Sequence, residues 1–294
     1  MYELIQVGAQ SYYINCPAKI GVYRTNETDV WLIDSGNDKD AAKKVKKVLD
    51  GQGWQLKGII NTHSHADHIG GNQYLQKQTG CKIFAQGIEA DFTNHPILES
   101  AFLYGGYSCK DLRHKFLLAQ ESQVSVLSVG ELPPEFEIIP LPGHSFDMIG
   151  IRTPDNVIYL ADCVSSAATL EKYQLTFLYD IAAQLDTLDR VESMEAACFV
   201  PAHTDACTDM KELVQLNRQK IHEIRDHILE VLAEPIVFET LLQKLFTEYG
   251  LIMNFEQYVL IGSTVRSYLS WLKDCGLVTV SFENNLLCWK KAEA

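Results

Sequence analysis

The chain has 294 residues, of which 47% are hydrophobic and 21% are charged, a balance typical of ordered globular proteins. This length accommodates one large domain and one small domain, and it is too long for one ordinary compact core. The formal net charge of -13 makes general binding to nucleic acid or to anionic membranes unfavourable, because a surface of that sign repels phosphate groups.

The N-terminal segment MYELIQVGAQSYYINC lacks the basic stretch and apolar run of a signal peptide. Elsewhere no apolar run approaches the roughly 20 residues that a membrane helix needs. The eight cysteines form no CxxC pair, which argues against both a disulfide framework and a zinc ribbon. We therefore expect a cytoplasmic protein with reduced cysteines and no membrane partner.

Short strands and helices alternate in the first part of the chain. Apolar residues at Ala41, Val45 and Val48 recur at helical spacing among lysines, which predicts a half-buried helix. Strands are expected at 11–16, 21–24, 30–34, 56–61 and 81–85, and helices at 39–51 and 72–79. This alternation is typical of α/β layering.

Residues 86–123 form an aromatic stretch that fits no simple strand, and we interpret it as a helical insertion. Long segments that interrupt a compact α/β unit are often lids over active sites, and Gly105-Gly106 would provide a hinge. A dimer interface or a satellite core is an equally good interpretation.

The middle of the chain returns to strands at 136–141, 148–153, 157–160 and 198–200, with a helix at 176–194. The Pro154-Asp155-Asn156 sequence predicts a hairpin turn between the second and third of these strands.

The C-terminal part is predicted to be a separate helical unit. Helices are expected at 210–233, 238–249 and 255–275, followed by a hairpin at 277–289. This pattern predicts domains at 1–209 and 210–294, the second of them like a winged helix. Its last helix offers only Arg266 and Lys273 as cations, with Asp274 opposing them, so we favour packing or oligomerisation, such as a homodimer, over nucleic-acid binding.

The sequence HSHADH at residues 63–68 carries the strongest chemical signal. His63 and His65 are separated by one residue, so on an extended loop both side chains can reach one metal ion. Asp67 and His68 follow immediately and diverge from that pair, which suits them to a neighbouring ion. Because a catalytic zinc takes about three protein ligands, further ligands are needed.

Three more candidates follow apolar strands: His144 in PLPGHS, Asp162 in VIYLADC and His203 in FVPAH. Strand ends that meet at one sheet edge would bring them to the HSHADH loop. The sequence therefore predicts a site with two metal ions.

These residues resemble the metallo-β-lactamase-fold hydrolase superfamily, and within it the glyoxalase II-like branch, whose THxHxDHxGGN signature matches residues 62–72. The resemblance implies an αββα sandwich over the first two-thirds of the chain. It also implies that His63, His65 and His144 hold one ion, that Asp67, His68 and His203 hold the other, and that Asp162 bridges them. Asp67 and Asp162 are the predicted catalytic residues, and the expected ions are zinc, with iron or manganese as alternatives.

The resemblance also implies a reaction. Water that bridges two ions would lose its proton near neutral pH and attack an ester-like bond in a small-molecule substrate. Thioester, lactone and phosphodiester bonds all remain open. Asp162 stands where the true β-lactamases carry cysteine, and His65 stands where the oxygen-reducing di-iron branch carries glutamate, so neither activity is expected.

Alternative functions remain within the resemblance. A winged-helix tail accompanies single-stranded RNA cleavage in some members of the superfamily. Persulfide dioxygenases use one iron and would need only His63, His144 and Asp162. A non-catalytic regulator that binds DNA is a further alternative, and the glutathione-binding tail of glyoxalase II is not matched here.

Asp34 ends the apolar run VWLID and allows two interpretations. It matches the position where family members place a carboxylate near the metal loop, where it would orient a ligand. It could equally cap the turn before Ser35-Gly36.

Overall fold

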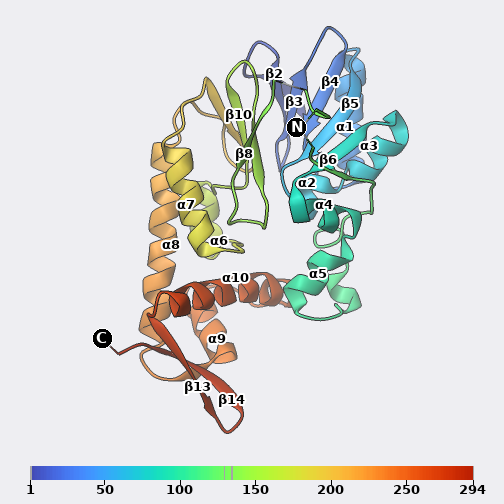
Figure 1. Ribbon diagram of the computed structural model, residues 1–294. Coiled ribbons are helices and arrows are strands. Elements are labelled where there is room, and N and C mark those ends of the chain that lie inside the picture. Colours follow the sequence, from blue (N-terminus) through green and yellow to red (C-terminus); the bar gives the residue numbers. More distant parts are fainter. Residues whose placement is uncertain (1, 129, 134, 294) are drawn as a thin grey trace.

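The computed structural model describes residues 2–128, 130–133 and 135–293, and its main body stacks in the order helices, sheet, sheet, helices (Figure 1). This is the predicted αββα sandwich. The C-terminal helices and hairpin lie below it, and α5 (Ile97–Tyr104) lies beside the end of α10 (Phe255–Asp274).

The first sheet contains seven strands in chain order. They are β1 (Glu3–Gln6), β2 (Ser11–Asn15), β3 (Ile20–Arg24), β4 (Asp29–Ile33), β5 (Gln55–Asn61), β6 (Lys82–Ala85) and β7 (Ser125–Val126). Strands β1 to β4 pair antiparallel, whereas β4 to β7 pair parallel. The parallel part needs crossover connections: α1 (Lys39–Gly51) joins β4 to β5, α2 (Ala66–Ile69) and α3 (Asn72–Thr79) join β5 to β6, and the insertion joins β6 to β7.

Strand β4 shows why this sheet is buried on both faces. Successive side chains of a strand point to opposite faces. Val30 and Leu32 pack in the cluster beneath α1, while Trp31 and Ile33 pack in the cluster between the two sheets. The apolar run VWLI thus contributes to both cores.

The second sheet has the order β11-β10-β9-β8. Its strands are β8 (Glu137–Pro140), β9 (Ile149–Arg152), β10 (Val157–Ala161) and β11 (Cys198–Pro201). The helices of this half are α6 (Ala167–Tyr173), α7 (Ile181–Glu192) and α8 (Lys211–Val231). Leu160 of β10, Leu188 of α7 and Val214 of α8 share one hydrophobic cluster, which fixes these helices against the sheet.

The insertion is helical in its first part, as predicted, with α4 (Gly87–Asn94), α5 (Ile97–Tyr104) and the short η1 (Lys110–Leu112). Residues 113–124 form turns and coil. Leu103, Leu112 and Leu117 pack with Val259 of α10, which is the satellite core expected as one alternative. The lid function stays a prediction.

The C-terminal part contains α9 (Phe238–Glu248) and α10 (Phe255–Asp274), then β13 (Val278–Glu283) and β14 (Leu286–Lys291), with β12 (Ile236–Val237) beside β14. Asn284 and Asn285 form the hairpin turn with φ of 51° and 64°, a conformation that asparagine tolerates. One hydrophobic cluster contains both Leu160 and Leu269, so packing continues across residue 209. The domain boundary and the winged-helix assignment stay predictions.

Two predictions of local structure were wrong in their bounds. The helix expected at 176–194 begins at Ile181, because Asp180 caps it by accepting a hydrogen bond from the Ala183 N–H. The HSHADH motif, expected to be all loop, becomes helical at Ala66, where α2 starts. Strands β1, β7 and β12 and helix α6 were not predicted.

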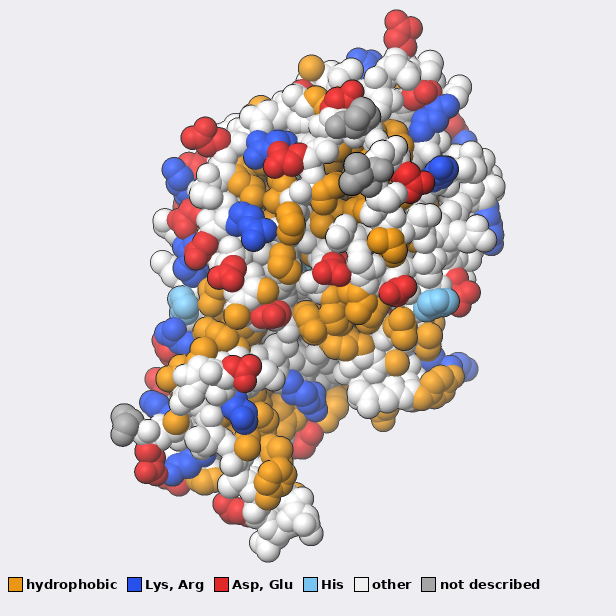
Figure 2. Space-filling model, viewed as in Figure 1, with side chains coloured by type: hydrophobic (Ala, Val, Ile, Leu, Met, Phe, Trp, Pro, Cys, Tyr) orange, Lys and Arg blue, Asp and Glu red, His pale blue; other side chains and the backbone are white. Residues whose placement is uncertain are grey.

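Hydrophobic side chains gather where the sandwich meets the lower helices (Figure 2). A groove of about 920 Å³ lies there between α5, α7 and α10, and Phe102, Tyr179 and Trp271 contribute to its walls. Among the described residues, no helix is both long and apolar enough to cross a membrane.

Candidate metal centre

The seven predicted ligands follow the ends of strands at one edge of the sandwich. His63 and His65 follow β5, and α2 then places Asp67 and His68. His144 follows β8, Asp162 follows β10 and His203 follows β11. Because β10 and β11 are parallel neighbours, their carboxyl ends meet at the same edge.

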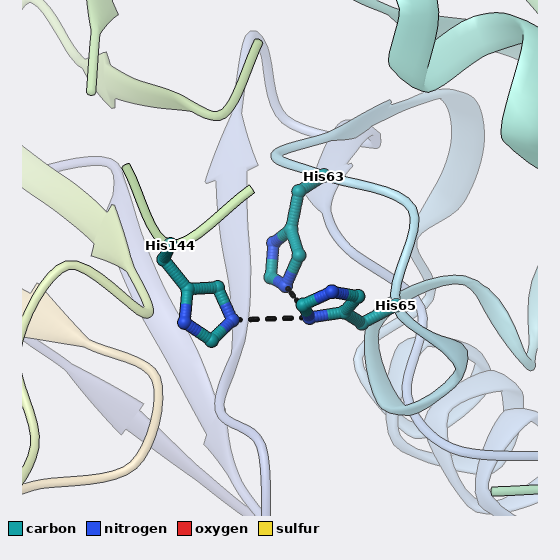
Figure 3. A group of neighbouring side chains, drawn as sticks. All are labelled: His63, His65 and His144. Atoms are coloured by element: carbon teal, nitrogen blue, oxygen red, sulfur yellow. Dashed lines mark hydrogen bonds between the residues drawn. The ribbon is translucent and has the colours of Figure 1, made fainter. Parts of the chain in front are cut away.

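Three histidines converge in the first cluster, which Figure 3 shows. The Nδ1 atom of His65 lies 3.0 Å from Nε2 of His63 and 3.0 Å from Nε2 of His144. His63 is fully buried, and the other two side chains are half-buried. One ion could therefore contact three imidazole nitrogens.

Four residues form the second cluster: Asp67, His68, Asp162 and His203. The Nε2 atom of His203 lies 3.2 Å from Oδ2 of Asp67 and 3.2 Å from Oδ2 of Asp162. The Nε2 atom of His68 lies 3.6 Å from Oδ2 of Asp67 and 3.2 Å from Oδ1 of Asp162. Two nitrogens and two carboxylates thus face a common point.

Asp162 lies between the clusters. Its Oδ2 atom is 3.2 Å from His203 in the second cluster and 3.5 Å from Nε2 of His144 in the first. Its Oδ1 atom and the Nε2 atom of His68 are both buried. They lie 3.2 Å apart without forming a hydrogen bond, and neither has another partner within the described residues. Buried polar atoms normally have partners, so these two fit a bound cation.

The outer nitrogens of the histidines are held by groups outside the clusters. Nδ1 of His63 lies 3.0 Å from the Thr62 hydroxyl, and Nδ1 of His144 lies 3.1 Å from the carbonyl oxygen of Phe177. Nδ1 of His203 lies 3.0 Å from the carbonyl oxygen of Pro17. Such contacts fix the tautomer and direct the other nitrogen inward, as in metal sites.

Asp34 holds the loop after β5. Its carboxylate accepts hydrogen bonds from the Thr62 N–H at 2.8 Å and from the Thr62 hydroxyl at 2.7 Å. It also lies 2.8 Å from Nδ1 of His68. These contacts fit the first interpretation of Asp34, a carboxylate that orients a ligand.

The two clusters differ in charge. Burial lowers the pKa of His65 and of His144 to about 4, and burial with the neighbouring histidines lowers the pKa of His63 well below its usual range. The first cluster therefore presents neutral imidazoles, which is the form that binds metals.

In the second cluster, carboxylates and imidazoles stabilise each other's charges. Asp162 raises the pKa of His203 to about 10. Burial works against the charged form of Asp67, but His68 and His203 outweigh it and lower the pKa of Asp67 to about 2. Burial disfavours the charged form of His68, but the carboxylates of Asp162 and Asp67 outweigh it and raise its pKa well above the usual range. A cation bound here would replace the protons on His68 and His203.

The wall of the centre includes residues that sequence reasoning missed. The Phe177 ring lies 5.2 Å from the ring of His65 and 5.7 Å from that of His144, centroid to centroid. The Glu99 carboxylate lies 3.8 Å from Nε2 of His65, and burial raises its pKa to about 8. Glu89, also in the insertion, contacts the ligand loops. Glu89 and Glu99 lie in an aromatic insertion and Phe177 lies in a segment that was predicted to be helical, so their places in the sequence gave no signal of this.

Comparison with known proteins agrees with this geometry. The family model of the metallo-beta-lactamase superfamily matches residues 14–203, which includes all seven candidate ligands. The structure is similar to a beta-lactamase domain protein from Burkholderia ambifaria, with a TM-score of 0.74, 15% identity and coverage of 99% of this chain and 94% of that one. A metallo-beta-lactamase family protein from Thermus thermophilus gives a TM-score of 0.69 at 17% identity, over 96% of this chain and 99% of that one.

Curated relatives named hydroxyacylglutathione hydrolase match parts of the chain. The protein from Nitrobacter winogradskyi is 26% identical over 142 residues, covering 48% of this chain and 46% of that protein. The one from Bradyrhizobium sp. is 26% identical over 154 residues, covering 51% of each. The chain spans about half or less of the length of the curated relatives it matches first. On the family match and the shared fold, the chain belongs to the metallo-beta-lactamase superfamily.

Proposed function

We propose that the protein is a metal-dependent hydrolase with two divalent ions, zinc in the first instance. The first ion is held by His63, His65 and His144, and the second by Asp67, His68 and His203. Asp162 contacts both. The observation that carries this proposal is the position of Asp162, whose Oδ2 atom lies 3.5 Å from His144 and 3.2 Å from His203.

Two divalent ions there would act as Lewis acids and supply a nucleophile from water near neutral pH. The chain's own residues then need only to hold and orient these groups. Imidazole and carboxylate ligands suit zinc, and both clusters consist of these two kinds of side chain. The four-residue second cluster supports two ions rather than the single iron of a dioxygenase.

Among ester-like bonds, we propose a thioester. The support is the similarity to proteins named hydroxyacylglutathione hydrolase, at 26% identity over about half the chain. The Phe177 ring beside His65 and His144 offers an apolar surface for an acyl group or a thiol.

A substrate panel tests the proposal. The metal content of the protein as purified is measured first, and the protein is then assayed on a thioester, a lactone and a phosphodiester, with Asp162→Asn as the matched variant that keeps the side-chain shape. We expect about two zinc ions per chain and thioester cleavage that is lost in the variant. One iron per chain, or equal cleavage by the variant, would contradict the proposal.

A further inference from the structure

Glu89 is a buried carboxylate outside both ligand clusters. It lies in the first turn of α4, within the insertion, and its side chain is completely buried. A buried carboxylate is costly unless donors surround it, so its partners indicate what it does.

One carboxylate oxygen of Glu89 holds the loop that carries His63 and His65. Oε2 accepts a hydrogen bond from the Ser64 N–H at 2.9 Å and another from the Ser64 hydroxyl at 2.6 Å. Ser64 lies between the two histidines, so both of its contacts fix the backbone from which the two imidazoles project.

The other oxygen holds the loop that carries His144. Oε1 accepts from the Ser145 hydroxyl at 2.6 Å and from the Asp147 N–H at 3.1 Å. Ser145 follows His144 directly. A single carboxylate therefore connects the two loops that supply the three histidines of the first cluster.

The position of Glu89 is itself fixed from the His144 loop. Oδ2 of Asp147 accepts a hydrogen bond from the Ile88 N–H at 3.0 Å. Gly87 permits this approach, because its φ is +42° and a Cβ there would lie 2.1 Å from the Asp147 carboxylate. The start of α4 and the His144 loop thus fix each other's position.

All four donors to Glu89 come from the loops of the first cluster. Asp34 differs from Glu89, because it contacts His68 of the second cluster directly as well as Thr62, which precedes His63. We propose that Glu89 is a positioning residue that sets the separation of the two first-cluster loops, so that His63, His65 and His144 can share one ion. The inference rests on the proposed metal centre.

The negative charge of Glu89 matters as well as its size. A carboxylate offers about four acceptor sites and no donor, which matches four donors. In Glu89→Gln, the amide NH₂ would face two of those donors, one of them a backbone N–H that cannot rotate away. Glu89→Gln therefore keeps the side-chain volume but no longer offers an acceptor to each of the four donors.

The experiment places Glu89→Gln in two backgrounds. In the first, Asp67→Asn and His203→Ala disable the second cluster; in the second, His65→Ala disables the first. Zinc affinity is measured by competition with a chromophoric chelator, and Co²⁺ absorption reports the ligand geometry. We expect Glu89→Gln to weaken zinc binding by about 10–100-fold in the first background, with a changed Co²⁺ spectrum, and to change it by less than about threefold in the second, where the loops it holds no longer bind an ion.

Two further variants keep the test decisive if Glu89→Gln fails to fold. Ser64→Ala and Ser145→Ala each remove one hydroxyl donor and should give smaller losses of zinc affinity, again confined to the first background. Ser122→Ala is the matched control, because Ser122 is buried and its hydroxyl has no hydrogen-bond partner within the described residues.

The outcomes separate this inference from the proposed centre. Unchanged zinc affinity in the first background, or an equal loss in both backgrounds, would overturn the role of Glu89 while the unmodified chain still binds two ions. An unmodified chain that binds no metal would overturn the proposed centre, and the inference with it.

Discussion

Strand β10 is flanked by an aspartate on each side, and the two carboxylates differ in the groups that surround them. Asp155 precedes the strand and is surrounded by donors. Its Oδ2 accepts from the N–H groups of Gln10 at 2.8 Å and Ser11 at 3.0 Å, and its Oδ1 accepts from the hydroxyls of Ser11 at 2.6 Å and Thr153 at 2.7 Å. These bonds connect the hairpin turn of the second sheet to the first sheet.

Asp162 follows the same strand and faces mainly histidines. Its Oδ1 atom is buried without a hydrogen-bond partner within the described residues, and its close contacts are His68, His144 and His203. Both oxygens of Asp155 have donors from the protein, whereas Oδ1 of Asp162 has none within the described residues, which fits a bound cation. The comparison distinguishes a structural carboxylate from one that belongs to a site.

The largest effect should come from Asp162→Asn. Loss of a ligand that contacts both clusters should weaken binding of the second ion by more than the roughly 100-fold that loss of an outer partner costs. The metal-free variant should stay folded, since a neutral amide is easier to bury than a carboxylate with one oxygen that lacks a hydrogen-bond partner. Metal analysis after dialysis, with Asp155→Asn as the control that keeps two ions, checks this. An Asp162→Asn chain with two tightly held ions would remove the distinction between the two aspartates.

Metal removal should have the next largest effect. An ion that binds only the folded state stabilises it by about 2.7 kcal/mol at a hundredfold excess over its dissociation constant. A strong chelator should therefore lower the free energy of unfolding of the unmodified chain and of Asp155→Asn, but should affect Asp162→Asn less. Urea unfolding with and without the chelator measures this. If the chelator leaves the free energy of unfolding of the unmodified chain unchanged, that result would contradict the site.

The features around Asp162 are those that a sequence can predict. Ligand residues follow apolar strands, and the period of the apolar residues identifies the strands and the helices that cross between them. The helices expected at 39–51 and 72–79 have those bounds in the structure. The structure brings all seven candidate ligands into two neighbouring groups.

The features around Asp155 are those that a sequence cannot predict. Pro154-Asp155-Asn156 indicated a turn and nothing more, because the partners Gln10 and Ser11 lie 145 and 144 residues away along the chain. Glu89 is similar, since it acts through serines 25 and 56 residues distant. Such contacts depend on how layers pack, which local patterns do not specify.

Replacement of Asp155 by asparagine should lower stability without changing metal binding. Hydrogen bonds to a charged group contribute about 1.5–3 kcal/mol each when buried, and the half-buried position of Asp155 reduces this. We expect a loss of about 1–3 kcal/mol in the free energy of unfolding at pH 7, measured by urea unfolding. Asp29→Asn is the matched control and should change it little, because the Asp29 carboxylate contacts Asn26, Thr28 and Lys57 at the surface. Equal losses in both variants would mean that the contacts of Asp155 across the sheets add nothing.

The smallest effect is the pH dependence of that difference. Burial alone would raise the pKa of Asp155, but hydrogen bonds from Ser11 and Gln10 outweigh it and lower the pKa below its ordinary value. A carboxylate with a lowered folded-state pKa stabilises the protein above its unfolded pKa of about 3.9 and loses that contribution as the pH falls through the folded value. The stability difference between the unmodified chain and Asp155→Asn should therefore be constant from about pH 7 to about pH 5 and shrink below about pH 4. A difference that stays constant down to about pH 3 would mean that the loss of stability does not depend on the charge of Asp155 and comes instead from the NH₂ group of asparagine, which faces donors.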